Sequence, residues 1–292
     1  MIWQQLINGL TIGSTYALVT IGFSLIFGIL RLMNFANGAV FVLGAYLTLM
    51  IYTRLTSNFV IALIGSILIT GLVGFSIDRF GLRILRQKNA PRLAPMITTM
   101  GIATIIENFI LNAFGSETKA VPYAPDMGYY DIGSIRIGGF QMLILGVTIV
   151  LMVLVSLLVY RTKLGKAMLA TSQNQTAAAL MGINVASVIA FTFFLSAVLS
   201  SISGTIVGMY YKNIDITLSA AMGNKTFAAA VVGGIGNIPG AIVGGLVVGV
   251  IETLGASYIS TAYRDAIAFA ILIVVLLVRP TGFFGKKDIL KV

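Results

Sequence analysis

The chain has 292 residues, of which 58% are hydrophobic and only 10% are charged, and its mean hydropathy is +1.00. Since a soluble domain carries about a quarter charged residues, this composition indicates a protein surrounded by lipid. The absence of Cys and His excludes disulfides, Cys/His zinc sites, and catalytic or proton-relay chemistry that depends on histidine. The net charge of +10 is better explained by the orientation of membrane spans than by nucleic-acid binding.

Successive apolar stretches along the chain are long enough to form membrane-spanning helices. The first covers residues 1–30, has no charged residue and exceeds the length of a signal-peptide core, so we expect it to be retained. Later stretches cover residues 32–53, 55–77, 93–116, 137–160, 186–210, 226–251 and 266–278. We therefore predict an all-α, polytopic transmembrane helix bundle of about seven to nine spans with interrupted Gly-rich segments, forming one domain over residues 1–292.

Basic residues concentrate at Arg31 and in the segments 79–92, 161–166 and 279–291. All four places can lie on one side of the membrane, which the positive-inside rule makes the cytoplasm. The C-terminus is then cytoplasmic and the N-terminus external. The segment 115–136 falls outside, and its tyrosines indicate either an interfacial aromatic belt or a face for a solute-delivering protein.

The stretch around Asn34, Asn37 and Gly38 interrupts the second apolar region. Asn and Gly both weaken a helix, so these residues predict a break or a cap. If the break lies at membrane depth, its free backbone groups must face protein or a water-filled path. An ordinary cytoplasmic helix cap is the alternative, and both interpretations stay open.

Glu107 and Glu252 are the acidic residues most expected within spans. Because an acid inside a membrane is costly, it is a functional candidate by default. Glu107 and Asn108 could bind an ammonium or amide group in a pathway, or could form a hydrogen-bonded pair that joins helices. For Glu252, a position near the membrane interface is the simpler expectation.

Residues 162–184 form a polar segment on the predicted cytoplasmic side. Thr176 to Leu180 can form a short helix, and Gly182 is then well placed to end it. Such a helix of small residues offers a face that another protein can approach closely. A passive connector is the alternative.

A second interrupted region contains Gly233, Gly234, Gly236 and Pro239, which predict a broken helix. Two separate pairs, Gly240 with Gly244 and Gly245 with Gly249, have GxxxG spacing, which indicates close helix packing, with a role in lining the pathway as the alternative. The chain contains no GxxxxGK[ST] pattern, so we do not expect it to hydrolyse ATP or act as an enzyme.

Four motifs together resemble the LivH-type permeases of branched-chain amino acid ABC importers. They are NFANGAVFVLGAY at 34–46, TKLGKAMLATSQNQTAAALMGIN at 162–184, GNKTFAAAVVGGIGNIPGAIVGG at 223–245 and RPTGFFG at 279–285. The resemblance implies a bacterial inner-membrane permease that works with a second homologous permease, two cytoplasmic ATPase subunits and an external solute-binding protein. It implies no cofactor bound by this chain, because the partner ATPases use the ATP.

The resemblance also implies a coupling loop that docks the ATPase. The residues it assigns to this loop are Ala170, Ala177, Ala178, Ala179 and Gly182. Relatives often carry Arg and an acid where this chain has Leu169 and Asn174, so the charge pairing with the ATPase differs here.

Other functions remain as alternatives. Relatives in the wider family carry urea, amides, other amino acids or sugars. An ion-gradient-driven secondary transporter often uses buried acids or His as relays, of which this chain has few or none. A membrane enzyme would need a polar catalytic cluster, and no usual grouping is present.

Overall fold

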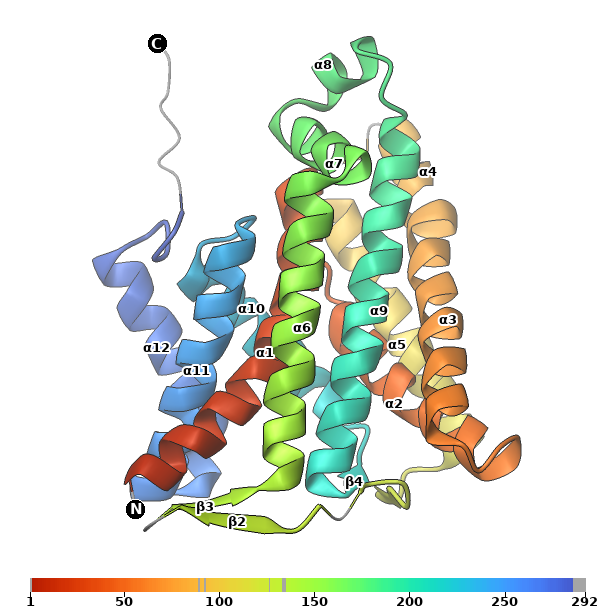
Figure 1. Cartoon of the computed structure of the whole chain (residues 1–292). Coiled ribbons are helices and arrows are strands. Elements are labelled where there is room, and N and C mark those ends of the chain that lie inside the picture. The colour runs from red at the N-terminus through yellow and green to blue at the C-terminus, as the bar shows by residue number, and fades with distance from the viewer. Residues whose placement is uncertain (1, 89, 92, 126, 133–134, 286–292) are drawn as a thin grey trace.

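The computed structural model describes residues 2–285 except 89, 92, 126 and 133–134, and these residues form a bundle of long helices (Figure 1). Seven helical segments within them are long and apolar enough to cross a membrane. They are α1 (Ile2–Leu30), α3 with its extension (Phe59–Gln87), α5 (Leu93–Phe114), α6 (Gly139–Arg161), α9 (Val185–Tyr211), α11 (Ile238–Tyr258) and α12 with its preceding turn (Thr261–Val278). The predicted polytopic helical bundle is confirmed, and seven lies within the predicted range.

Two shorter helices complete the bundle. They are α2 (Asn37–Arg54) and α10 (Leu218–Gly233), with 18 and 16 residues, fewer than the ~20 of a full span. Both are mostly buried, and α2 packs against α3, α9 and α10.

The segment Phe59–Gln87 is continuous but changes its helical type. It comprises α3 (Phe59–Ser76), a π-helical turn (Ile77–Leu82) and α4 (Arg83–Gln87). Asn58 begins it by accepting a hydrogen bond from the backbone N–H of Val60 at 3.0 Å, as an N-cap residue does. In the last span, a 3₁₀ turn (Thr261–Tyr263) precedes α12 (Arg264–Val278).

The predicted break in the Gly-rich stretch 226–251 is confirmed, but the predicted start of the stretch is wrong. α10 ends at Gly233 and α11 begins at Ile238, with Gly234 and Gly236 at φ values of +103° and +83° between them. Glycine adopts this conformation without steric cost. Lys225, which the sequence prediction left outside the span, lies within α10 and is buried.

Glycines on α11 allow it to lie directly against α1. A side chain at Gly245 would meet the backbone of Ala17, and one at Gly249 would meet Gly13. The two helices run antiparallel, since higher numbers on α11 pair with lower numbers on α1. This is the close packing that GxxxG spacing predicts.

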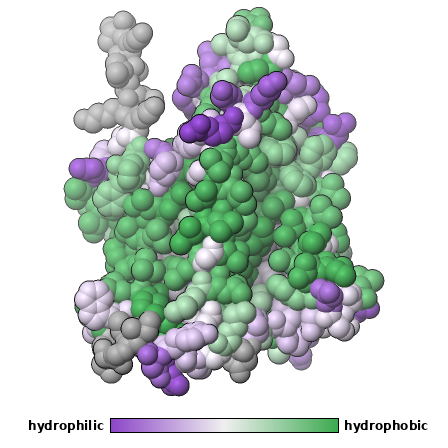
Figure 2. Space-filling model, viewed as in Figure 1, coloured by the Kyte–Doolittle hydropathy of each residue, from purple (hydrophilic) through white to green (hydrophobic). Residues whose placement is uncertain are grey.

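The two ends of the bundle differ in structure (Figure 1). One end carries α7 (Lys163–Gln173) and α8 (Gln175–Leu180). The opposite end, called the hairpin end, carries the strands β2 (Tyr129–Ile132) and β3 (Ile135–Gly138), which pair antiparallel, and β1 (Lys119–Ala120), which pairs with β4 (Asn213–Ile214). Figure 2 shows a broad apolar band between hydrophilic ends.

Tyrosines of the predicted external segment 115–136 divide into two groups. Tyr123 is buried and its ring lies 5.3 Å from that of Phe59 and 5.0 Å from that of Tyr52. Burial raises the pKa of Tyr123 above its ordinary value. Tyr129 and Tyr130 are exposed, so the aromatic-belt and partner-face interpretations both apply only to this exposed pair.

Candidate translocation path and coupling surface

The helix break between α1 and α2 lies inside the bundle. Asn34 and Asn37 are buried, and Asn37 Oδ1 accepts hydrogen bonds from Ser196 Oγ at 3.2 Å and Ser200 Oγ at 3.1 Å. These serines lie about 16 and 22 Å along α9 from its start at Val185, at ~1.5 Å per residue. Since α9 is a 27-residue span, Asn37 lies near its middle. The break is therefore at membrane depth, and its role in lining a pathway stays a prediction.

Replacing Asn37 with Leu is expected to lower the free energy of unfolding by about 1–3 kcal/mol, because two buried serine hydroxyls lose their shared acceptor. Thermal unfolding in detergent micelles measures this loss. The matched control is Asn112→Leu on the exposed face of α5, which removes an amide of the same size. Equal melting temperatures for the two variants would contradict the assigned role of Asn37.

Two more helices, α10 and α5, contact this break through Gly38 and Glu107. A side chain at Gly38 would meet the backbone oxygen of Ser219, at the start of α10. Ser219 Oγ donates to Glu107 Oε1 at 2.6 Å, which links α10 to α5. Glu107 thus makes the interhelical hydrogen bond that the sequence offers as one alternative. Asn108 is exposed and its Nδ2 donates to the Thr104 carbonyl at 2.8 Å, so it turns away from this contact.

The second break packs against the end of the chain. Phe283 and Phe284 donate backbone hydrogen bonds to the carbonyls of Val232 and Gly233 at 2.9 and 3.0 Å. Asn237 Nδ2 donates to the Phe284 carbonyl at 3.1 Å. Gly233, Gly234 and Gly236 therefore form a tight turn under the RPTGFFG motif, and their predicted pathway role stays untested.

The predicted short helix of the coupling segment is confirmed as α8. Asn174 Oδ1 accepts from the N–H of Ala177 at 3.0 Å and caps its start. Gly182 follows its end at a φ of +81°, the left-handed conformation that ends many helices. Gln175 Nε2 donates to the Ile29 carbonyl at 2.9 Å, which ties α8 to the end of α1.

The exposure of α8 separates the residues assigned to ATPase docking. Ala177, Ala179 and Gly182 are exposed, Ala170 is half-buried, and Ala178 is buried. Ala178 therefore packs α8 onto its own chain. Leu180 and Met181, which sequence analysis did not single out, are 84% and 83% exposed at the tip. Two apolar side chains this exposed indicate contact with a partner.

A buried charged cluster joins α1, α10, α11 and α12, and sequence analysis missed it. Lys225 Nζ lies 2.9 Å from Glu252 Oε1 and 3.0 Å from Asp265 Oδ1. Tyr16 OH donates to Glu252 Oε1 at 3.1 Å, and Arg264 Nε lies 3.5 Å from the same oxygen. Glu252 is only 2% exposed, so its carboxylate is enclosed by these helices, and its expected depth near the membrane interface stays a prediction. The available signal was Lys225, the one charged residue between Asp215 and Glu252.

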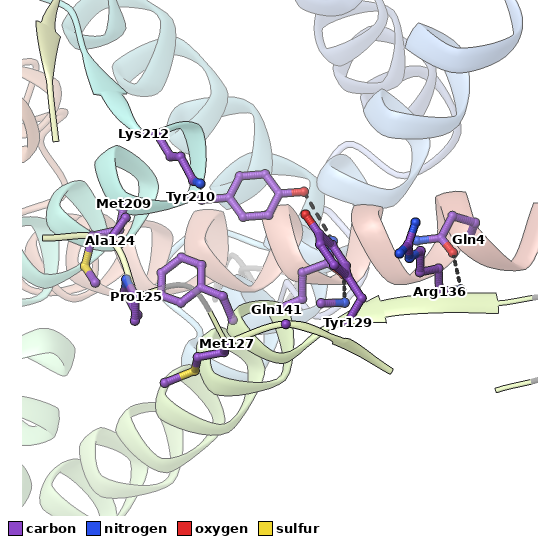
Figure 3. A pocket seen from close by; sticks show the side chains of 13 residues that line it. Gln4, Ala124, Pro125, Met127, Tyr129, Arg136, Gln141, Met209, Tyr210 and Lys212 are labelled. Atoms are coloured by element: carbon purple, nitrogen blue, oxygen red, sulfur yellow. Dashed lines mark hydrogen bonds between the residues drawn. The ribbon is translucent and has the colours of Figure 1, made fainter. Parts of the chain in front are cut away.

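A pocket of about 470 Å³ opens at the hairpin end (Figure 3). Gln4 Oε1 accepts from the backbone N–H of Arg136 at 2.9 Å, which joins α1 to β3. The Arg136 guanidinium lies 4.7 Å from the centre of the Tyr129 ring. Lys212 and the apolar side chains of Phe140 and Met209 complete the wall. The pocket combines basic, aromatic and apolar groups at the end opposite α8.

The profile of the family described as branched-chain amino acid transport system / permease component matches residues 5–276. The chain belongs to this permease family. It is 38% identical to the high-affinity branched-chain amino acid transport system permease protein LivH of Salmonella typhimurium, over 99% of this chain and 97% of the relative. The BraD permease protein of Pseudomonas aeruginosa is also 38% identical, with the same two coverages. The resemblance to LivH-type permeases is confirmed.

The fold of this permease is similar to a solved structure of PsaBC from Streptococcus pneumoniae in complex with Fab. The TM-score is 0.51 at 16% identity, covering 97% of this chain and 93% of that chain. At this identity the likeness concerns the fold alone. The seven apolar helices and the similarity to permease proteins indicate a multi-pass membrane protein.

Proposed function

We propose that this chain is the membrane-spanning permease of a bacterial ABC importer that carries branched-chain amino acids. In this proposal two cytoplasmic ATPase subunits supply the energy, a second homologous permease completes the path, and an external binding protein delivers the solute. The observation that carries the proposal is similarity to LivH and BraD permeases over nearly the whole chain. The exposed apolar tip of α8 supports the part concerning the ATPase.

The orientation of the permease follows from charge. Arg79, Arg83, Arg161, Lys163 and Lys166 belong to the segments at the α7–α8 end, so the positive-inside rule favours the cytoplasm for this end. Among the other basic residues assigned to the same side, Arg92, Lys286, Lys287 and Lys291 lie outside the described residues. The hairpin end, with its basic and aromatic pocket, is then the external face that receives the binding protein.

In our proposal the break around Asn37 lines the path of the amino acid. Asn37 Nδ2 is buried without a hydrogen-bond partner among the described residues, and such donors need an explanation. A passing carboxylate supplies an acceptor for it, while Glu107 supplies an acceptor for the ammonium group. The apolar helices around them suit a leucine-like side chain.

We place the second permease against the face of α5 that carries Thr104 and Asn108. Both side chains are exposed in this single chain, beside the exposed Ile105 and Phe109. Polar groups are unfavourable toward lipid within a span. A neighbouring permease covers them in our proposal.

The test is uptake of radiolabelled leucine into proteoliposomes that contain the permease with its candidate partners, with ATP inside and the binding protein outside. We expect uptake that requires ATP and every partner. Omitting one partner at a time provides the controls. Uptake by this chain alone, driven by an ion gradient, would replace the proposal with a secondary transporter. ATPase stimulation by a binding protein loaded with a different solute, without leucine uptake, would keep the importer and change the solute.

A further inference from the structure

A groove of about 330 Å³ lies between the π-helical turn that follows α3 and the first turns of α9. Arg79, Arg83 and Ser187 line one part of it, and Phe75, Phe191 and Phe194 line the other. Because α3 and α9 run antiparallel, Arg83 and Ser187 lie toward the α7–α8 end while Phe75 and Phe194 lie deeper in the bundle. The groove is therefore amphipathic along its length.

Neither Arg79 nor Arg83 forms an ion pair within the described residues. Asp78, the acidic neighbour of Arg79, is 1% exposed and lies 2.7 Å from Arg86. Throughout the residues that the structure describes, no carboxylate oxygen lies within 4.0 Å of the guanidinium of Arg79 or Arg83. Two positive charges, about one helical turn apart, thus line the groove without a carboxylate in direct contact.

The apolar part of the groove is a surface of closely packed phenyl rings beside side chains that face lipid. Phe191 and Phe194 stack with ring centres 6.3 Å apart. A Cβ added at Gly71 would lie 2.6 Å from the Phe194 ring, so this glycine lets the ring lie directly on α3. Leu68 and Leu72 of the same helix are 54% and 60% exposed, as expected for side chains that contact acyl chains.

We propose that this groove binds an anionic phospholipid. The phosphate lies between Arg79 and Arg83, with the Ser187 hydroxyl as a further donor, and an acyl chain follows Phe75, Phe191 and Phe194 into the bilayer. The positive end of the α9 dipole adds attraction, since Ser187 is in its first turn. A free phosphate would leave the phenyl groups uncovered. Basic pockets between membrane helices on the cytoplasmic side recognise anionic lipid head groups by the same physics.

This assignment does not depend on the transported solute. It explains two arginines that the positive-inside rule treats only as orientation signals. It also explains why a polar, positively charged groove opens directly beside exposed leucines. A bound lipid would cover the seam where α3 meets α9 through Gly71 and Gly74.

The test is native mass spectrometry of the purified full chain titrated with phosphatidylglycerol, phosphatidylcholine or glycerol 3-phosphate. We expect retained phosphatidylglycerol and little retained phosphatidylcholine. The double variant Arg79→Gln/Arg83→Gln should weaken phosphatidylglycerol binding roughly 30-fold, from the attraction that each basic residue contributes near a charged bilayer surface. Arg79→Lys/Arg83→Lys should retain most of the binding, because the charges remain.

The matched control is Arg161→Gln/Lys163→Gln, which removes two exposed charges at the same end but outside the groove. Equal loss in the control and in the groove variant would overturn the proposal, as would equal binding of phosphatidylcholine. Glycerol 3-phosphate that binds as tightly as the lipid would reduce the groove to a phosphate site. If Phe191→Asp, checked for folding by gel filtration, leaves lipid binding unchanged, the acyl-chain assignment is wrong.

Discussion

Replacing Leu180 and Met181 together with Asp is expected to abolish ATP-driven uptake while the permease stays folded. Both side chains are more than four-fifths exposed at the tip of α8, so their replacement removes little packing within the chain, and exposed substitutions of this kind usually change stability by less than about 0.5 kcal/mol. At a partner interface the same change buries two unpaired carboxylates. Every ~1.4 kcal/mol of lost contact energy weakens association about tenfold.

Two measurements test this expectation: co-purification of the ATPase subunits with the permease, and uptake into proteoliposomes. The matched control is Leu55→Asp, because Leu55 is 73% exposed at the hairpin end and receives the same chemical change. We expect the α8 variant to lose the ATPase and the control to retain it. Full uptake by the Leu180→Asp/Met181→Asp variant at normal membrane abundance would remove α8 from the coupling surface.

The contrast between α8 and its neighbours shows which features a sequence can predict. The sequence predicts a short helix from Thr176 to Leu180 that ends at Gly182, and α8 starts one residue earlier, at Gln175. These bounds depend on residues a few positions apart, so local rules can predict them. The breaks between α1 and α2 and between α10 and α11 are likewise predicted from local Asn and Gly residues. Local rules do not predict that the Ala178 side chain points inward, because its direction depends on how the segment folds back onto the ends of α1 and α9. Ala177, Ala178 and Ala179 look alike in sequence, and only packing separates them.

The buried cluster around Lys225 shows more clearly what a sequence pattern cannot predict. Its members come from four helices, and Tyr16 lies 236 residues before Glu252. No periodicity or spacing in the chain encodes which helix faces which. A lysine after an uncharged stretch looks like the boundary of a span, and the prediction placed that boundary after Lys225 for this reason. Only the pairing with Glu252 and Asp265 makes its burial in α10 favourable.

Replacing Lys225 with Met is expected to destabilise the bundle strongly. It leaves Glu252 buried with Tyr16 and the more distant Arg264 as partners, and breaking a buried pair by removing one partner costs about 3–5 kcal/mol. The double variant Lys225→Met/Glu252→Met should recover most of this loss, because no uncompensated charge then remains at the centre. Asp265 is 63% exposed and Arg264 is 34% exposed, so both can turn toward water.

Thermal unfolding of the single and double variants in detergent micelles forms a double-mutant cycle that isolates the Lys225–Glu252 interaction. Lys119→Met is the matched control, since Lys119 pairs with Glu117 at 3.7 Å on the surface, where an ion pair contributes at most about 1 kcal/mol. A double variant as unstable as Lys225→Met alone would show that the lysine acts through its packing. A single variant no less stable than the control would show that the four helices hold together without this charge cluster.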